Sequence, residues 1–222
     1  MRILVTAGGT EEPVDGVRRL TNLSTGATGG VLARHFAERG AEVLLLHAER
    51  AVPSEAPSEQ QTFVTFADLE AALRQILSER RWDAVVHLAA VSDYSIASVE
   101  VDGRKIPVDD QGKIGSDSEV VIRLQPNPKL IDSIKQWSRN PGPLVVGFKL
   151  TNDSDPVVRE AQVRRLLDRG TTDLVVHNDL RDINDVKHHA TIFDSRGPLV
   201  RTETKEQLAR ELFRLMTNGN PQ

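Results

Sequence analysis

The chain contains no cysteine among its 222 residues, and this absence excludes both disulfide bonds and a thiol nucleophile. Aromatic residues make up only 4% of the sequence, and the formal net charge is −4. A nucleic-acid binding protein usually presents a basic face with interleaved aromatic side chains. The composition therefore argues against a nucleic-acid partner and favours chemistry on small molecules.

Long hydrophobic runs are also missing, since no apolar stretch approaches the roughly 20 residues that span a bilayer. The amino terminus lacks the basic and then apolar pattern of a signal peptide. We therefore expect a cytoplasmic protein that does not insert into membranes. The length suits one sizeable α/β domain and no linker divides the chain, so we predict a single domain over residues 1–222.

Short apolar runs alternate with segments of helical periodicity. Runs typical of buried strands occupy 1–7, 41–47 and 83–90, a shorter candidate strand lies at 62–66, and helical spacing covers 29–40 and 68–80. This β-α-β-α-β order predicts an α/β fold with a doubly wound, mostly parallel, Rossmann-like sheet, whose ligands bind at the carboxyl ends of the strands. Further strands are predicted at 119–124, 144–149 and 173–176, helices at 128–137, 155–169 and 205–216, a hairpin at 189–201, and a polar surface loop at 51–61.

The first βα connection, GGTEEPVDGVRRLTNLSTGATGG, is far longer than such a loop requires. Gly8 and Gly9 allow backbone N–H groups to approach an anion closely. Ser24, Thr25 and Gly26 add hydroxyl and N–H donors beside a helix start, whose dipole favours negative charge. The pattern indicates a phosphate-binding loop. A flexible surface loop has the same composition, and the spacing is neither a Walker A motif nor a strict G-x-G-x-x-G.

Polar residues follow four of the predicted strands. These strand ends continue into the glycine loop, into Val91–Tyr94, into Phe148–Lys149 and into His177–Asp179. Because the carboxyl ends of parallel strands share one edge of a sheet, we expect these residues to converge on a ligand. Any one of them alone is equally typical of an ordinary helix cap or turn.

Three other sets of residues leave alternatives open. Residues 97–118 are polar, include Lys113 and lack strong periodicity, which indicates either a flap over the phosphate site or a solvated loop. Asn127 precedes a predicted helix and suits an N-cap or a ligand contact. Arg165 and Arg169 share one face of a predicted helix, where solvated arginines are the default. The six histidines show no metal-ligand spacing, so we predict no zinc site.

Six ordered motifs carry a family resemblance: ILVTAGGTEEPVDGVRRLTNLSTGATGG, LAAVSDY, GKIGSDSE, QPNPKL, VVGFKL and DLVVHND. Together they resemble the phosphopantothenate-cysteine ligases (phosphopantothenoylcysteine synthetases) of coenzyme A biosynthesis across essentially the whole chain. With no amino-terminal flavin domain, the chain is similar to the stand-alone bacterial form. The resemblance implies that phosphopantothenate attacks the α-phosphate of CTP to form an acyl-cytidylate and pyrophosphate, and that the cysteine amine then displaces CMP.

The resemblance also implies roles for individual residues. Asn22 would contact the acyl-phosphate region, and Lys113 would be the cation of the flap. The implied nucleotide-binding set is Gly8, Gly9, Thr10, Arg18, Ser24, Thr25, Gly26, Ala90, Asp93, Asn127, Phe148, Arg165 and Arg169. Mg²⁺ would be bound chiefly by triphosphate oxygens without a protein metal site. The family implies a homodimer whose active site borrows residues across the interface.

Two departures from the family pattern affect the nucleotide. Bacterial members often carry KIKK where this chain has KIGS, so only the first lysine, Lys113, is retained. Arg165 and Arg169 replace two lysines that contact nucleotide, which keeps the charge but changes its geometry. The basic pair favours CTP, with ATP as the alternative.

Two other classes of protein share parts of this pattern. A short-chain reductase that uses NAD(P) has the same strand-loop-helix opening, but it needs a Tyr-x-x-x-Lys pair, and residue 98, four after Tyr94, is serine. A non-catalytic nucleotide-binding module would share the glycine loop. Titration with NADPH tests the first class, and pyrophosphate release tests the second.

Overall fold

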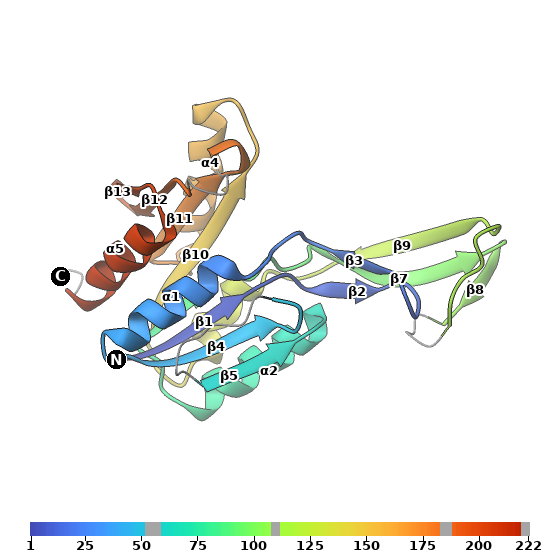
Figure 1. Ribbon diagram of the computed structural model, residues 1–222, viewed down its shortest axis with the longest axis horizontal. Coiled ribbons are helices and arrows are strands. Elements are labelled where there is room, and N and C mark those ends of the chain that lie inside the picture. Colours follow the sequence, from blue (N-terminus) through green and yellow to red (C-terminus); the bar gives the residue numbers. More distant parts are fainter. Residues whose placement is uncertain (52–58, 108–111, 183–187, 219–222) are drawn as a thin grey trace.

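Eight strands form one mostly parallel sheet in the computed structural model, which describes residues 1–51, 59–107, 112–182 and 188–218. The strands are β1 (Arg2–Ala7), β4 (Glu42–Ala48), β5 (Glu59–Phe63), β6 (Ala84–His87), β10 (Leu144–Thr151), β11 (Leu174–Asp179), β12 (Ala190–Asp194) and β13 (Gly197–Thr202). Their order is β13-β12-β11-β10-β6-β1-β4-β5, with only β12 and β13 antiparallel to their neighbours. The predicted α/β class with a mostly parallel sheet is confirmed (Figure 1).

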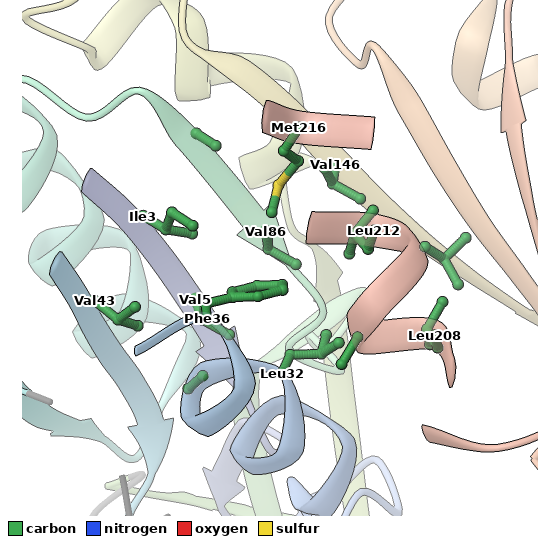
Figure 2. Packing of buried hydrophobic residues seen from close by; sticks show 14 of the residues in the cluster. Ile3, Val5, Leu32, Phe36, Val43, Val86, Val146, Leu208, Leu212 and Met216 are labelled. Atoms are coloured by element: carbon green, nitrogen blue, oxygen red, sulfur yellow. The ribbon is translucent and has the colours of Figure 1, made fainter. Parts of the chain in front are cut away.

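Helices cover both faces of this sheet. One face packs against α1 (Ala27–Glu38) and α5 (Lys205–Thr217), and the other against α2 (Phe66–Glu79), η1 (Leu130–Ser133), α3 (Ile134–Trp137) and α4 (Pro156–Leu167). Central strands are therefore buried on both sides, which explains their continuous apolar runs. In β1, Ile3 and Val5 face α1 and α5, while Leu4 faces α2. Figure 2 shows the α1 and α5 side chains packed on the strands, with Phe36 fully buried among them.

A separate antiparallel structure projects from the sheet (Figure 1). It consists of β7 (Tyr94–Val101), β8 (Arg104–Ile106) and β9 (Val120–Pro126) in the order β8-β7-β9, and we call residues 94–126 the arm. A hairpin of β2 (Glu11–Pro13) and β3 (Arg19–Thr21) lies along it, and we count this hairpin as part of the arm. Val14 from this hairpin packs with Val99 and Ile114 of the arm in a small buried cluster.

The arm corrects two predictions. Residues 97–118 are not an aperiodic flap, because they include most of β7 and all of β8; Asp109 and Asp110 lie outside the described residues. A β-bulge between Ile96 and Ser98 breaks the alternation of buried residues, so the period of two was not visible in the sequence. The glycine connection is likewise not all loop, since it contains β2 and β3.

Several boundaries also differ from prediction. The strand predicted at 62–66 corresponds to β5, which begins earlier, at Glu59. Residues 59–61 of the predicted polar loop therefore belong to β5, and residues 52–58 of that loop lie outside the described residues. The helix predicted at 128–137 is a 3₁₀ turn followed by one short helical segment. Helix α4 ends at Leu167, so Arg169 lies beyond it, just before Gly170 at φ 70°. Within the described ranges, no helix combines the length and apolar character needed to cross a membrane.

Candidate functional site

The carboxyl ends of β1, β6, β10 and β11 meet at two adjoining cavities, as predicted from the polar residues that follow these strands. The larger cavity, of about 730 Å³, lies between the segment after β6, the end of β10 and one face of α4. The smaller cavity, of about 200 Å³, lies between the start of α1 and the ends of β10 and β11. Ala89, Ala90, Phe148 and Leu150 line both, so one extended ligand can occupy them together.

The start of α1 forms one wall of the smaller cavity. Its N-cap, Gly26, has φ 72° and makes no side-chain capping hydrogen bond, and the first turn holds no acidic residue. The N–H groups of a first helical turn have no partners within the helix, and the dipole places partial positive charge there. Together with Ser24 and Thr25, which also line this cavity, the uncapped turn is suited to a phosphate.

Asn22 is held between the glycine loop and the segment after β6. Its Nδ2 donates to the carbonyl of Val91 at 3.1 Å, and a Cβ on Gly9 would come within 2.5 Å of the Asn22 carbonyl oxygen. The side chain is exposed at the rim next to Ala90, which lines both cavities. The close packing against Gly9 therefore positions an amide beside the junction of the two cavities.

Thr10 and Ala90 connect the two loops and are satisfied internally. The Thr10 N–H donates to the Ala90 carbonyl at 3.2 Å, and the Thr10 Oγ1 accepts from the Ser92 N–H at 2.9 Å. The Ala90 N–H donates to the Gly8 carbonyl at 2.8 Å. Thr10 is fully buried, so in this structure its hydroxyl supports the loops and does not reach the cavities.

Asp93 faces the larger cavity with Lys129, whose Nζ donates to Asp93 Oδ1. Asn127 supports this segment, because its N–H donates to the Asp93 carbonyl at 2.8 Å and its Nδ2 to the Ser92 carbonyl at 3.1 Å. Asn127 is not the helix N-cap, since Lys129 occupies that position before η1. Lys129 is a cation of the site that sequence reasoning missed, although it lies in the QPNPKL motif.

Arg165 and Arg169 both line the larger cavity, although only Arg165 belongs to α4. Arg169 Nη1 donates to Asp132 Oδ2 at 2.7 Å, and Thr171 donates to the same carboxylate at 3.2 Å. Asp132 thus holds one guanidinium in place, while Arg165 forms no ion pair with any other described residue. Val157 and Val158 on the same helix leave apolar surface at the mouth, and Val157 is 74% exposed.

Arg18 and Lys113 lie together on the arm and border neither cavity among the described residues. Arg18 Nη1 forms an ion pair with Asp15 at 2.8 Å and also contacts the Ile114 carbonyl. Burial raises the pKa of Asp15, but N–H donors from Val17, Ile114 and Arg18 outweigh it and hold that pKa at about 2. Lys113 is exposed beside Ile114. The Arg18 side chain is therefore held at Ile114, the residue next to Lys113, and neither Arg18 nor Lys113 borders the two cavities described for its own chain.

Two histidines border the cavities. His87 lines the larger one, and burial lowers its pKa to about 4, so it is neutral at neutral pH. Thr6 Oγ1 accepts from the Ala89 N–H at 3.2 Å and lies within hydrogen-bond distance of His87 Nδ1, at 2.9 Å. His188 lines the smaller cavity, and nothing in its local sequence indicated this.

Of the predicted site residues, nine line the cavities: Gly8, Ser24, Thr25, Gly26, Ala90, Asp93, Phe148, Arg165 and Arg169. Gly9, Thr10, Asn22 and Asn127 lie beside or behind them, and Arg18 and Lys113 are on the arm. Of the last three residues of β11, Asn178 lines the smaller cavity, whereas the side chains of His177 and Asp179 face the opposite side of the sheet. This division follows from the alternation of side chains along a strand.

Comparisons with known proteins agree with this architecture. The family model for the DNA/pantothenate metabolism flavoprotein C-terminal domain matches residues 1–219. The chain is 33% identical over 214 residues to the coenzyme A biosynthesis bifunctional protein CoaBC of Thermococcus kodakarensis, covering 96% of this chain and 50% of that protein. The chain thus spans about half the length of this curated relative.

Solved structures share the fold. A DNA/pantothenate metabolism flavoprotein from Streptococcus pneumoniae superposes with a TM-score of 0.83 at 30% identity, covering 96% of this chain and 97% of that one. The Cab2 mutant H337A in complex with phosphopantothenate-cysteine gives a TM-score of 0.74 at 20% identity, covering 98% and 86% of the two chains. At that identity the second likeness concerns the fold alone.

Proposed function

The chain belongs to the DNA/pantothenate metabolism flavoprotein C-terminal domain family, and from this premise we propose that it ligates phosphopantothenate to cysteine with the consumption of CTP. The observation that carries the proposal is the pair of adjoining cavities at the strand ends. One is lined by two arginines and the other by an uncapped helix start. Their shared wall suits a nucleoside triphosphate whose phosphates point at α1.

The reaction has two steps. The carboxylate of phosphopantothenate attacks the α-phosphorus of CTP, the bond to the bridging oxygen breaks, and pyrophosphate leaves. The cysteine amine then attacks the acyl carbon, CMP departs with its phosphate oxygen, and the amine loses a proton. The first step brings two anions together, so donors and cations are needed where the negative charge accumulates.

The residues of the two cavities can be assigned to this reaction. The first turn of α1 with Ser24 and Thr25 binds phosphates, Asp93 and Phe148 hold the nucleotide, and Asn22 orients the acyl-phosphate group at the junction. The lining of the cavities suits an Mg²⁺ ion whose ligands come mainly from the nucleotide. Asp93 is the one carboxylate among the described residues that line the cavities, and it is already paired with Lys129. Bound in that way, the metal neutralises phosphate charge. Arg165 and Arg169 add positive charge and favour CTP.

A second copy of the chain would complete the site. Strand β9 pairs only with β7 in the described part of the arm, and every residue along it is exposed, including Val120, Val121 and Ile122. An exposed apolar edge strand is a liability unless another chain covers it. We propose a homodimer formed through β9, in which the partner's arm delivers a lysine and an arginine to these cavities.

Mixing two inactive variants tests whether the site is shared. If Lys113 acts across the interface, a dimer of Lys113→Ala with Asn22→Ala contains one intact site. Re-associated equimolar mixtures should then regain up to about a quarter of the parent rate, since half of the random dimers are mixed. No recovery, with mixed dimers confirmed by mass spectrometry, would place Lys113 in the site of its own chain.

Pyrophosphate release tests the ligase itself. The full chain with Mg²⁺ and phosphopantothenate should release pyrophosphate from CTP faster than from ATP, and adding cysteine should convert the accumulated intermediate to product. Omission of phosphopantothenate is the control for nucleotide hydrolysis. Release that does not depend on phosphopantothenate would contradict the proposed reaction.

A further inference from the structure

The imidazole of His188 is buried without a hydrogen bond that would satisfy it. The residue is 8% exposed, and its Nε2 has no hydrogen-bond partner among the described groups. Its backbone is fixed, because the His188 N–H donates to the Glu203 carbonyl at 2.8 Å. A buried polar atom without a hydrogen-bond partner is costly to folding, and such atoms in native proteins often serve in binding or catalysis.

The side chain points into the smaller cavity. His188 lies two residues before Ala190, on the same side of the extended chain, and Ala190 packs in the cluster that α1 and α5 cover. His188 accordingly lines the smaller cavity with Asn178 and the start of α1. The neighbouring His189 faces the other side of the sheet, where it borders a different cavity with Arg159 and Arg201.

The helix start on the opposite wall of the smaller cavity lacks a side-chain N-cap. The helices α2, α4 and α5 each have a side-chain N-cap, provided by Thr65, Asp155 and Thr204. Helix α1 instead begins at Gly26 with no side-chain cap and no acidic residue in its first turn. His188 at the end of the sheet and the start of α1 therefore line the same space of about 200 Å³.

We infer that His188 donates from Nε2 to the terminal phosphates of the bound nucleotide and holds them against the first turn of α1. This deepens the proposed function and rests on it. When the bond at the α-phosphorus breaks, negative charge grows on the departing pyrophosphate, and a donor already in place there stabilises the leaving group. The sequence places His188 far along the chain from the glycine loop, so no local motif joins the two.

The charges around the ring agree with a neutral donor. Burial first, and then the nearby Lys205, lower the pKa of His188, while Glu206 raises it. Both charged residues lie in the first turn of α5. A neutral imidazole carries one ring proton, and with that proton on Nε2 it donates without adding a fixed positive charge to the cavity.

Binding of inorganic pyrophosphate tests the inference without requiring turnover. Calorimetry with Mg²⁺ should show that His188→Ala binds pyrophosphate about 10- to 100-fold more weakly than the parent, the scale for a hydrogen bond to a charged group. His188→Gln, whose amide reaches a position near Nε2, should recover part of the affinity. His189→Ala is the matched control and should bind like the parent. CMP, which lacks the terminal phosphates, should bind His188→Ala and the parent equally.

The outcomes separate the inference from the proposed ligase. Circular dichroism and thermal melting establish that each variant is folded. If folded His188→Ala binds pyrophosphate as the parent does, or if the parent does not bind it, the inference is wrong even when ligation proceeds. If His188 governs pyrophosphate binding while no ligation occurs, the contact stands and the proposed reaction fails. In the parent, a shift of the His188 Nε2 proton signal on adding pyrophosphate would locate the contact directly.

Discussion

Replacing Gly26 with alanine should damage both the fold and the phosphate site, because two separate penalties act at this position. The residue has φ 72°, where a Cβ costs about 1–2 kcal/mol. The added Cβ would also lie 2.7 Å from the Cβ of Ala51, and overpacking of this kind costs roughly 1–3 kcal/mol. For a chain of this length, the combined loss of about 2–5 kcal/mol predicts a fall in Tm of about 4–20 °C.

Gly40 provides a matched control for the backbone penalty. It has φ 84° at the other end of α1, and a Cβ there meets nothing within 4 Å. Gly40→Ala should therefore lose only about 1–2 kcal/mol, or about 2–8 °C in Tm. Because Gly40 is remote from both cavities, this variant should bind CTP like the parent.

The assay is thermal melting combined with calorimetric titration of CTP. Gly26→Ala should melt below Gly40→Ala and bind CTP at least about 10-fold more weakly, since the first turn of α1 is displaced from the phosphates. Adding Ala51→Gly should relieve the clash and recover part of the Tm but leave the strain in φ. Parental stability and CTP affinity in Gly26→Ala would refute the conformation assigned to this helix start.

Four further predictions concern the reaction. Lys113→Ala should lower the rate of pyrophosphate release by on the order of 100-fold with an unchanged melting curve, as expected for loss of a preorganised cation. A parental rate would mean that Lys113 is a solvated side chain without a role in the first step. Arg165→Ala should raise the Michaelis constant for CTP by about 5-fold and change turnover little, because an exposed charge at about 4 Å from a phosphate contributes about 1 kcal/mol in water. The increase in the Michaelis constant should become smaller at high salt. A loss confined to turnover would contradict this prediction. Asn22→Asp keeps the size of the side chain but replaces its donor with a negative charge, so the attack of the cysteine amine should slow more than activation. Mass spectrometry of quenched reactions should then show accumulation of acyl-cytidylate. Equal loss of both steps without this intermediate would limit Asn22 to binding or folding. A chelator should abolish pyrophosphate release and excess Mg²⁺ should restore it, because the triphosphate supplies most of the metal ligands; undiminished activity would exclude a metal requirement.

Sequence reasoning located residues of the cavities where the signal was local. The glycine loop and Asp93 come after apolar strands and Phe148 lies near the end of one, so their place at the carboxyl edge of the sheet could be read from the chain. Prediction was less complete where the contact depended on distant segments. Thr10 was expected at the phosphates, but its hydroxyl is taken by the Ser92 N–H. Lys129 was overlooked because its pairing with Asp93 needs two strand ends to meet.

The sequence by itself determined the alternation of buried strands and amphipathic helices, because burial on one or both faces imposes a period on neighbouring residues. That period was enough to predict the parallel sheet and the edge at which the cavities lie. In the arm it predicted β9, at 119–124, but not β7 and β8, because a bulge after Ile96 shifts the register.

Only the tertiary structure decided which side chains share a cavity. His188 and Gly26 come from distant parts of the chain, and they meet because β11 and β12 extend the sheet beside α1. The same packing directs His189 to the opposite face and holds Arg18 and Lys113 on the arm, away from the cavities. Periodicity records whether a residue is buried, whereas contacts between distant residues depend on the order and register of the strands.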